Sequence, residues 1–273
     1  MPRINWHKIG VGIIVPLILI VIWQLFSSLG LVNKHILPSP YSVLNRWVIY
    51  LLPKKTYVDS GLGYFSWIFS GELIEDILNS MFRVISGFVI GAGIALPLGL
   101  LMGKSKKIYA YIDPLIQILR PIPPIAYIPL AILWFGLGNP PAIFLISIGA
   151  FFPILINTIA GVRNVDGIYI RAARNLGANQ LTMFIRIILP AAIPYILSGV
   201  RIGIGTSFIV VIVAEMIAVN NGLGFRILEA REYFWSDKII AGMLSIGFLG
   251  LSIDLVVTKL NNYLLRWHRG LDN

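Results

Sequence analysis

The chain contains long apolar runs that carry no charge, and these runs constrain its fold more than any other feature. Residues 9–29, 84–102 and 141–162 contain no Asp, Glu, Lys or Arg. A helix of about 20 apolar residues crosses the hydrocarbon core of a bilayer. Charged residues make up 12% of the chain, whereas a soluble domain averages about 25%. The sequence therefore excludes a water-soluble enzyme and a disordered chain, and it predicts an integral membrane protein.

Six candidate membrane spans follow from the apolar runs: residues 9–29, 84–102, 108–137, 141–162, 187–219 and 239–260. The first span is longer than the apolar region of a signal peptide, about 7–15 residues, and no small-residue cleavage site follows it. We therefore expect it to be retained as a helix. The fifth span would measure about 50 Å as one helix. We expect it to tilt, protrude or break near Pro190 and Pro194.

The Lys and Arg residues set the expected orientation of the spans. If the N-terminus is cytoplasmic, the inner segments carry twelve Lys and Arg against three acidic residues, and the outer segments carry seven against seven. Because cytoplasmic segments are richer in Lys and Arg, we expect both termini to be cytoplasmic. The same bias explains the formal net charge of +10 without a nucleic-acid partner.

The residue composition excludes several kinds of chemistry. The chain has no cysteine, which excludes disulfides, thiolate metal sites and Cys nucleophiles. Its three histidines are far apart in sequence and outside the apolar runs (His7, His35 and His268). We therefore expect no metal site and no haem pocket.

One segment looks like a phosphate-binding loop but departs from that pattern. Gly99 and Gly103 precede Lys104, but three residues separate the glycines where the nucleotide-binding pattern has four. The segment also ends an apolar run instead of following a strand. We interpret it as a membrane helix that runs into a basic cytoplasmic turn, and we expect no ATP hydrolysis by this chain.

A basic segment follows the fourth span. It contains Arg171, Ala172, Ala173 and Arg174, and Gly177 comes three residues later. The pattern predicts a short helix that ends at Gly177, because glycine readily adopts the positive φ of a helix end. The alanines would let another surface approach closely, and the arginines would attract an acidic partner. The residues alone equally allow a basic loop at the membrane surface.

The same segment resembles the EAA motif of ABC importer permeases: Glu-Ala-Ala, three residues, Gly, nine residues, then Ile-x-Leu-Pro. The matching positions are Ala172, Ala173, Gly177, Ile187, Leu189 and Pro190. Arg171 stands where the general motif has Glu, as is familiar in the subgroup that resembles nitrate, sulfonate, taurine and bicarbonate importers. Shorter segments resemble that subgroup at residues 37–40, 120–124, 134–138, 214–215 and 222–224.

The resemblance implies an all-α type I ABC permease fold with about six transmembrane helices, in a chain that pairs with a second copy of itself. The implied domains are an N-terminal transmembrane helix (1–30), an extracytoplasmic linker with an amphipathic segment (31–78), a permease core (79–265) with a cytoplasmic coupling loop (163–186), and a cytoplasmic tail (266–273).

The resemblance also implies the partners. Separate ATPase subunits would dock around Arg171, Ala172, Ala173, Arg174 and Gly177 and would bind ATP and Mg, so no cofactor is expected in this chain. An extracytoplasmic binding protein would deliver the cargo to the outer loops. The implied location is the cell inner membrane, and the implied cargo is a small anion of the nitrate, sulfonate, taurine or bicarbonate type.

Arg120 and Glu215 are the candidate residues of the transport pathway. Arg120 begins a proline-rich stretch, and irregular backbone at membrane depth is tolerated only inside protein or beside a water-filled cavity. Its cation could attract an anion, or it could cap a helix kink while reaching towards water. Glu215 lies inside a span, where a charge needs a partner or water. It could line or gate the pathway, or form a structural ion pair.

Arg201 and Asp254 are two further charges in the spans, and we expect each to pack or pair. Arg201 lies 14 residues before Glu215, about 21 Å along a helix, so these two side chains cannot pair with each other unless the helix folds back.

The sequence thus predicts the membrane subunit of an ATP-driven anion importer that performs no covalent chemistry. The alternative is an autonomous secondary carrier or channel, which an inverted repeat would favour. An intramembrane enzyme would need a catalytic set that the sequence does not show, and a bare scaffold is disfavoured by the EAA resemblance.

Overall fold

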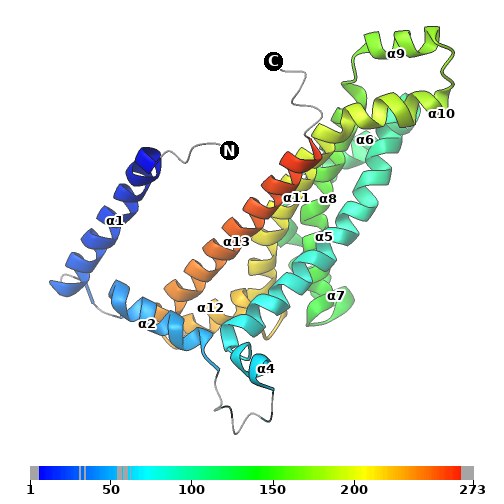
Figure 1. Cartoon of the computed structure of the whole chain (residues 1–273). Helices are drawn as coiled ribbons and strands as arrows, with labels where there is room; N and C mark the ends of the chain where they lie inside the picture. The colour runs from blue at the N-terminus through cyan, green and yellow to red at the C-terminus, as the bar shows by residue number, and fades with distance from the viewer. Residues whose placement is uncertain are drawn as a thin grey trace. The chain divides into compact units, whose positions relative to one another are not determined.

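The computed structural model is built from helices, as the sequence predicts (Figure 1). It describes residues 6–30, 32–33, 35–53, 57, 61 and 63–265. Within these residues the β-structure is one isolated bridge between Pro53 and Gly71. The predicted tail at 266–273 lies outside the described residues.

The chain divides into two compact units, and each is described here by itself. The first comprises Met1–Asp76 and Arg226–Gly247, and the second comprises Ile77–Phe225 and Phe248–Asn273. The domain boundaries expected at residues 30, 78 and 265 stay a prediction.

The first unit contains α1 (Trp6–Ser28), α2 (Pro40–Leu51), α4 (Tyr64–Ile68), the first turn of α5 (Glu72–Lys104), most of α12 (Leu223–Glu232) and the first half of α13 (Ser236–Leu264). The start of α2 follows from its sequence, because the side chain of Ser39 accepts a hydrogen bond from the Ser42 N–H and proline follows at the first helical position. The indole of Trp47 on α2 donates to the Ser245 hydroxyl on α13 at 2.8 Å.

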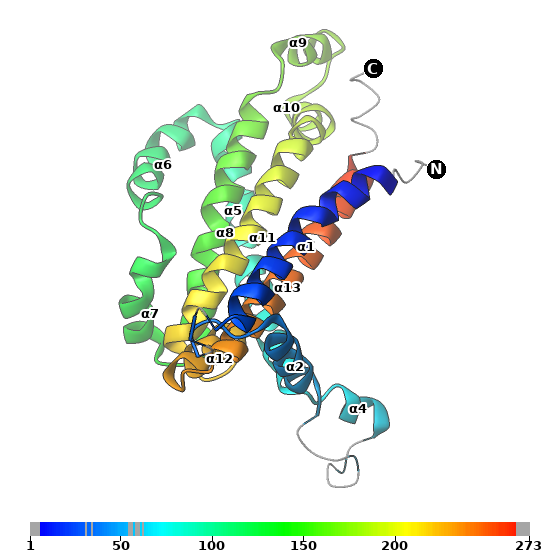
Figure 2. The same cartoon turned by 90° about the vertical axis from the view of Figure 1, so that its left-hand side faces the viewer.

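The second unit contains the rest of α5 and α13 together with α6 (Lys106–Leu119), the 3₁₀ turn η1 (Pro124–Tyr127), α7 (Ile128–Phe135), α8 (Asn139–Arg163), α9 (Gly167–Asn175), α10 (Gln180–Met183), the π-helical turn η2 (Phe184–Ile188) and α11 (Leu189–Ala218). Helix α8 packs along α11 and contacts α7. In Figure 2, α6 and α7 lie to the left of α8 and α11 lies to its right. Its inward residues, including Ala150, Ile154 and Leu155, are fully buried.

Small residues bring α5 and α8 together. A Cβ atom added at Gly87, Gly91, Gly99 or Gly103 of α5 would come within 3 Å of an atom of α8. Glycines at this spacing let two membrane helices approach closely. Gly99 and Gly103 are therefore helix-packing residues, which agrees with the membrane-helix interpretation of the segment before Lys104.

The helices coincide with the predicted spans. By length and composition, four of the described helices can cross a membrane, and α6 with the η1–α7 segment, bent by 83°, forms either a broken fifth span or a re-entrant loop. The described apolar part of α1, Ile14–Ser28, is shorter and lies within the first predicted span. Helix α5 begins at Glu72, twelve residues before the second predicted span, because the polar residues of its first turns are paired within the protein.

The fifth predicted span is continuous with the helix before it. Gln180–Ala218 forms one helical run of 39 residues, and the break expected near Pro190 takes the form of the π-helical turn η2, which ends two residues earlier. Proline has no N–H to give to the preceding turn, and a π turn accommodates the missing bond without a sharp bend.

Candidate functional site

Helix α9 and the turn after it are shaped by local hydrogen bonds. The side chain of Asp166 accepts from the Ile168 N–H at 2.9 Å and begins the helix. Gly177 ends it with φ +79°. The N–H groups of Gly177 and Ala178 each donate at 3.0 Å, to the carbonyls of Arg174 and Ala173. The predicted short helix that ends at Gly177 is confirmed.

Most of this helix is presented to the outside of the second unit. Arg171, Ala172, Arg174 and Gly177 are exposed, whereas Ala173 is buried against its own unit. In Figures 1 and 2, α9 lies beyond the ends of the long helices. The two arginines and the apolar Leu176, which is 89% exposed, form a surface that could dock a partner.

Arg120 lies at the bend between α6 and α7. Its backbone N–H donates to the Ile116 carbonyl at 2.9 Å and ends α6. The prolines that follow prevent the helix from continuing, so the chain turns through 83° before α7. The side chain of Arg120 is exposed and lines two cavities.

The first of these, which we call the apolar cavity, has a volume of about 500 Å³. The bend, α8 and α11 line it with mainly apolar side chains, among them Pro124, Phe152 and Ile209. Its polar lining residues besides Arg120 include Asn157 and Thr206. The volume lies within the usual range for a small-molecule site, about 300–1,000 Å³.

The second, which we call the inner cavity, has a volume of about 770 Å³ and lies between α6 and α8. Arg163, at the end of α8, places its guanidinium 4.0 Å from the centre of the Tyr109 ring. Gln117 donates from its side-chain amide to the Asp113 carboxylate at 2.5 Å. With Arg120, the cavity has two cations and one carboxylate in its lining.

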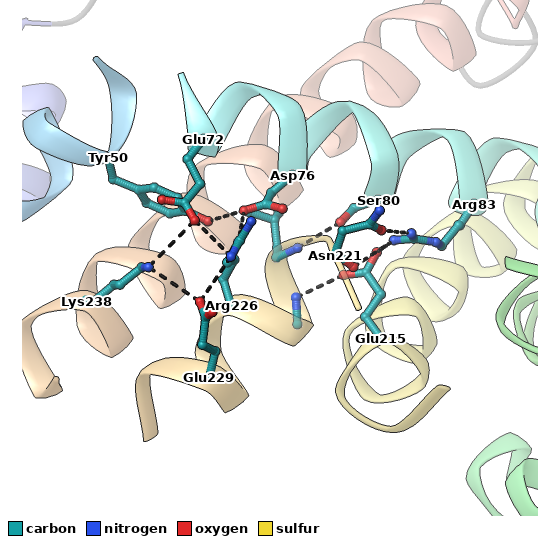
Figure 3. Close-up of polar contacts among 12 residues, drawn as sticks. Tyr50, Glu72, Asp76, Ser80, Arg83, Glu215, Asn221, Arg226, Glu229 and Lys238 are labelled. Atoms are coloured by element: carbon teal, nitrogen blue, oxygen red, sulfur yellow. Dashed lines mark hydrogen bonds and ion pairs between the residues drawn. The ribbon is translucent and has the colours of Figure 1, made fainter. Parts of the chain in front are cut away.

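Glu215 lies in a buried network of the second unit (Figure 3). Its Oε1 is 2.6 Å from Nη1 of Arg83, and these side chains are 0% and 1% exposed. Its Oε2 accepts from the Gly224 N–H at 2.9 Å. Arg83 also donates to the side chain of Asn139 at 2.8 Å and to both the carbonyl and the side chain of Asn221.

The glycines near residue 222 are required by this network. Gly222 has φ +102°, and a Cβ there would lie 2.6 Å from the Glu215 carboxyl carbon and 2.7 Å from Arg83 Nη1. The next N–H, of Leu223, donates to the Ser80 hydroxyl at 3.1 Å. The Gly-Leu-Gly segment thus folds closely over the ion pair.

The two candidate pathway residues are placed in different surroundings. Arg120 lines both cavities, whereas Glu215 lines neither. Arg201 pairs with Asp254 at 2.8 Å, so the expectation that it does not pair with Glu215 is confirmed. Sequence reasoning missed Arg83. The sequence did contain an indication of such a residue, because the carboxylate of Glu215 inside a span requires a cation from another part of the chain.

A second polar cluster lies in the first unit (Figure 3). Arg226 on α12 makes ion pairs with Asp76 at 2.8 Å, Glu72 at 2.9 Å and Glu229 at 3.1 Å. The Tyr50 hydroxyl donates to Asp76 at 2.7 Å. Lys238 lies 3.6 Å from Glu229 and 3.8 Å from Glu72.

The cluster shifts the pKa of three groups outside the membrane spans, Tyr50, Arg226 and Glu229. Burial, together with the charge and hydrogen bond of Asp76, raises the pKa of Tyr50 above its ordinary value. Burial alone would raise the pKa of Glu229, but the hydrogen bond and charge of Arg226 and the charge of Lys238 outweigh it and lower that pKa. Among the described residues, no group of three His, Asp or Glu could hold a metal ion.

Comparison with known proteins assigns the chain to a family. The model of the binding-protein-dependent transport system inner membrane component matches residues 95–270, well over half of the chain. The chain belongs to this family. The matched region includes α9, both cavities and Glu215, whereas Arg83 lies before it.

The permease has relatives along nearly its whole length. It is 31% identical to the taurine transport system permease protein TauC of Escherichia coli, over 97% of this chain and 94% of that one. It is 36% identical to the bicarbonate transport system permease protein CmpB of Synechococcus elongatus, over 96% and 93%. The MetNI methionine ABC transporter in an inward-facing conformation has a chain with the same fold, with a TM-score of 0.63, 18% identity, and 72% and 97% coverage.

Proposed function

We propose that the permease forms the translocation pathway for a small oxyanion of the sulfonate, bicarbonate or nitrate type. The observation that carries the proposal is the position of Arg120, at the bend and in the lining of both cavities. Its guanidinium supplies positive charge and several N–H donors, which suit oxyanions. Two relatives are named as permeases for taurine and for bicarbonate, and these names support the same class of cargo.

Transport is driven by separate ATPase subunits in this proposal, and these subunits bind ATP and Mg. The permease itself catalyses no reaction. The supporting observation is the exposed basic surface of α9, with Arg171, Ala172, Arg174 and Gly177. Because Ala173 is buried, it holds α9 in place and the four exposed residues meet the partner.

A second copy of the chain completes the pathway, and the pair is a two-fold symmetric homodimer. Closed oligomers of one chain are most often two-fold, and the pairing would bring a second Arg120 to the route. An extracytoplasmic binding protein delivers cargo to the outer segments. The permease lies in the inner membrane with both termini and α9 on the cytoplasmic side, which the excess of Lys and Arg in the inner segments supports.

Glu215 acts on the pathway indirectly. Its ion pair with Arg83 fastens the end of α11, the helix that also lines the apolar cavity through Thr206 and Ile209. A carboxylate repels an anion, so the pair with Arg83 keeps this charge neutralised away from the cargo.

The test is uptake by the complex of permease, ATPase and binding protein in proteoliposomes. Arg120→Gln should reduce uptake of taurine, bicarbonate or nitrate about tenfold or more, the value of one charge-assisted hydrogen bond, and Arg120→Lys should retain more. Lys259→Gln is the control, since Lys259 is an exposed cation outside both cavity linings and outside the coupling loop. Parental uptake of all three anions by Arg120→Gln would overturn the role of Arg120.

A further inference from the structure

The inner cavity has a cation at each end. Tyr109 precedes Arg120 on α6 by eleven residues, about 16 Å along the helix axis. Arg163 of α8 lies against the Tyr109 ring, so its guanidinium marks the end of the cavity far from Arg120. Both arginines line the same continuous space.

The position of Arg163 is held by its contacts. The ring of Tyr109 attracts the guanidinium at 4.0 Å through a cation–π interaction. The Arg163 side chain also hydrogen-bonds to Tyr109, but a guanidinium has five N–H donors, so others are left for a further acceptor. Asn164, the next residue, lines the cavity as well and adds a neutral amide.

The charges between the two arginines do not cancel them. Asp113 is the carboxylate in the lining, and Gln117 donates a hydrogen bond to it. Two cations and one carboxylate leave the cavity positive by one charge. Along α6, Asp113 lies four residues after Tyr109 and seven before Arg120, and the side chains of Gln117 and Tyr109 both hydrogen-bond to it. The one carboxylate in the lining therefore already has donors of its own.

We infer that Arg163 forms a second binding position for an oxyanion, at the end of the inner cavity opposite Arg120. The ligand is a sulfonate, bicarbonate or a similar small oxyanion, held by the N–H groups of Arg163 with Asn164 beside it. The inference rests on the proposed function for the identity of the cargo, but not for the existence of the site. In transport, the anion passes from Arg120 to Arg163 before release.

The absence of cysteine from the chain allows a direct test of the charge in this cavity. Ala160 lines the inner cavity, and Ala160→Cys would place one thiol there. The ATP-free complex is treated with two methanethiosulfonate reagents, one carrying an ethylsulfonate and one a trimethylammonium group. The mass shift of the permease gives the rate of each reaction.

Each rate is divided by the rate of the same reagent with a free thiol in solution, and on this scale the sulfonate reagent should react faster than the cationic one. Adding Arg163→Gln should lower the ratio of the two rates about fivefold or more, because a unit charge within about 8 Å changes the local concentration of a unit ion by such a factor. Arg163→Lys, which keeps the charge, should preserve the ratio, and so should the control Lys259→Gln, at an exposed cation outside the cavity. Added salt should lower the ratio in the Ala160→Cys chain with Arg163 intact. This measurement tests the charge of the site even if Arg163→Gln fails to fold.

Taurine or bicarbonate should slow the sulfonate reagent in the Ala160→Cys chain and should lose this effect with Arg163→Gln. An unchanged rate ratio in Arg163→Gln, or a thiol that neither reagent reaches, would overturn the inference. The labelling needs no transport. A complex that labels as expected but imports no anion would therefore contradict the proposed function and leave the oxyanion site standing.

Discussion

The guanidinium of Arg83 lies 2.6 Å from the carboxylate of Glu215, and both side chains are buried. One residue belongs to α5 and the other to the end of α11. The hydrogen bonds from Arg83 to Asn139 and Asn221 extend the pair to α8 and to the segment before α12. This network therefore joins four parts of the second unit at a single arginine.

Neutralising one residue of the Arg83–Glu215 ion pair should destabilise the permease more than neutralising both. Arg83→Gln alone leaves the buried Glu215 carboxylate without its cation, at a cost of about 3–5 kcal/mol. The double variant Arg83→Gln/Glu215→Gln should recover part of that loss, because no unpaired charge remains. The apparent unfolding temperature in detergent would measure the difference. A single variant as stable as the parent would contradict the structural role of the pair.

Gly222→Ala should be more damaging than the same change at Gly136. Both glycines have positive φ, so each substitution adds backbone strain of about 1–3 kcal/mol. A Cβ at Gly136 meets nothing within 4 Å, whereas a Cβ at Gly222 would lie 2.6 Å from the Glu215 carboxyl group. The clash of this Cβ with Glu215 should lower the stability of Gly222→Ala by about 1–3 kcal/mol more. Equal unfolding temperatures for the two variants would show that the Gly-Leu-Gly segment is not packed on the ion pair.

Acid should weaken the cluster around Arg226. The pKa of Glu229 is below its ordinary value of 4.5, so the folded state binds this proton less readily than the unfolded state. Its stabilisation is fully present above pH 4.5 and is lost as the pH falls through the lowered pKa. Glu229→Gln should therefore lose less stability than the parent on acidification. Glu232→Gln, an exposed site on the same helix, is the control and should follow the parent.

Gly177→Asp should uncouple the permease from its ATPase. The φ of +79° strains any residue with a side chain, and the new carboxylate lies at a helix C-terminus, where negative charge is unfavourable. The variant should insert into the membrane but lose binding-protein-stimulated ATP hydrolysis. Gly61→Asp is the control, since Gly61 also has positive φ and no atoms near its Cβ position. Equal stimulated hydrolysis in the two variants would exclude a coupling role for the α9 turn.

The parts of the structure that the sequence predicts are those that depend on neighbouring residues. Apolar runs predict spans because about 20 residues are enough to cross a bilayer. Gly177 predicts a helix end and the prolines after Arg120 predict a bend because each acts on its own backbone. The Arg83–Glu215 pair could not be predicted in this way, since the two residues are separated by 132 positions and Arg83 lies one residue outside the predicted span.

Apart from Arg120, the residues that line the cavities could not be predicted from the sequence for the same reason. Arg163 contributed to the predicted orientation as one of the cytoplasmic cations, but its position against Tyr109 depends on how α6 packs on α8. The glycines of α5 likewise show their role only beside the side chains of α8.

Uptake of a labelled oxyanion into proteoliposomes that hold the permease, its ATPase and its binding protein tests the central claim most directly. Uptake is measured in proteoliposomes with and without enclosed ATP. Each of these two conditions is tested with and without an imposed ion gradient. Import by the proposed mechanism requires ATP and the binding protein, and the gradient alone should give none. Accumulation driven by the gradient in the absence of ATP would contradict the account and identify the chain as a secondary carrier.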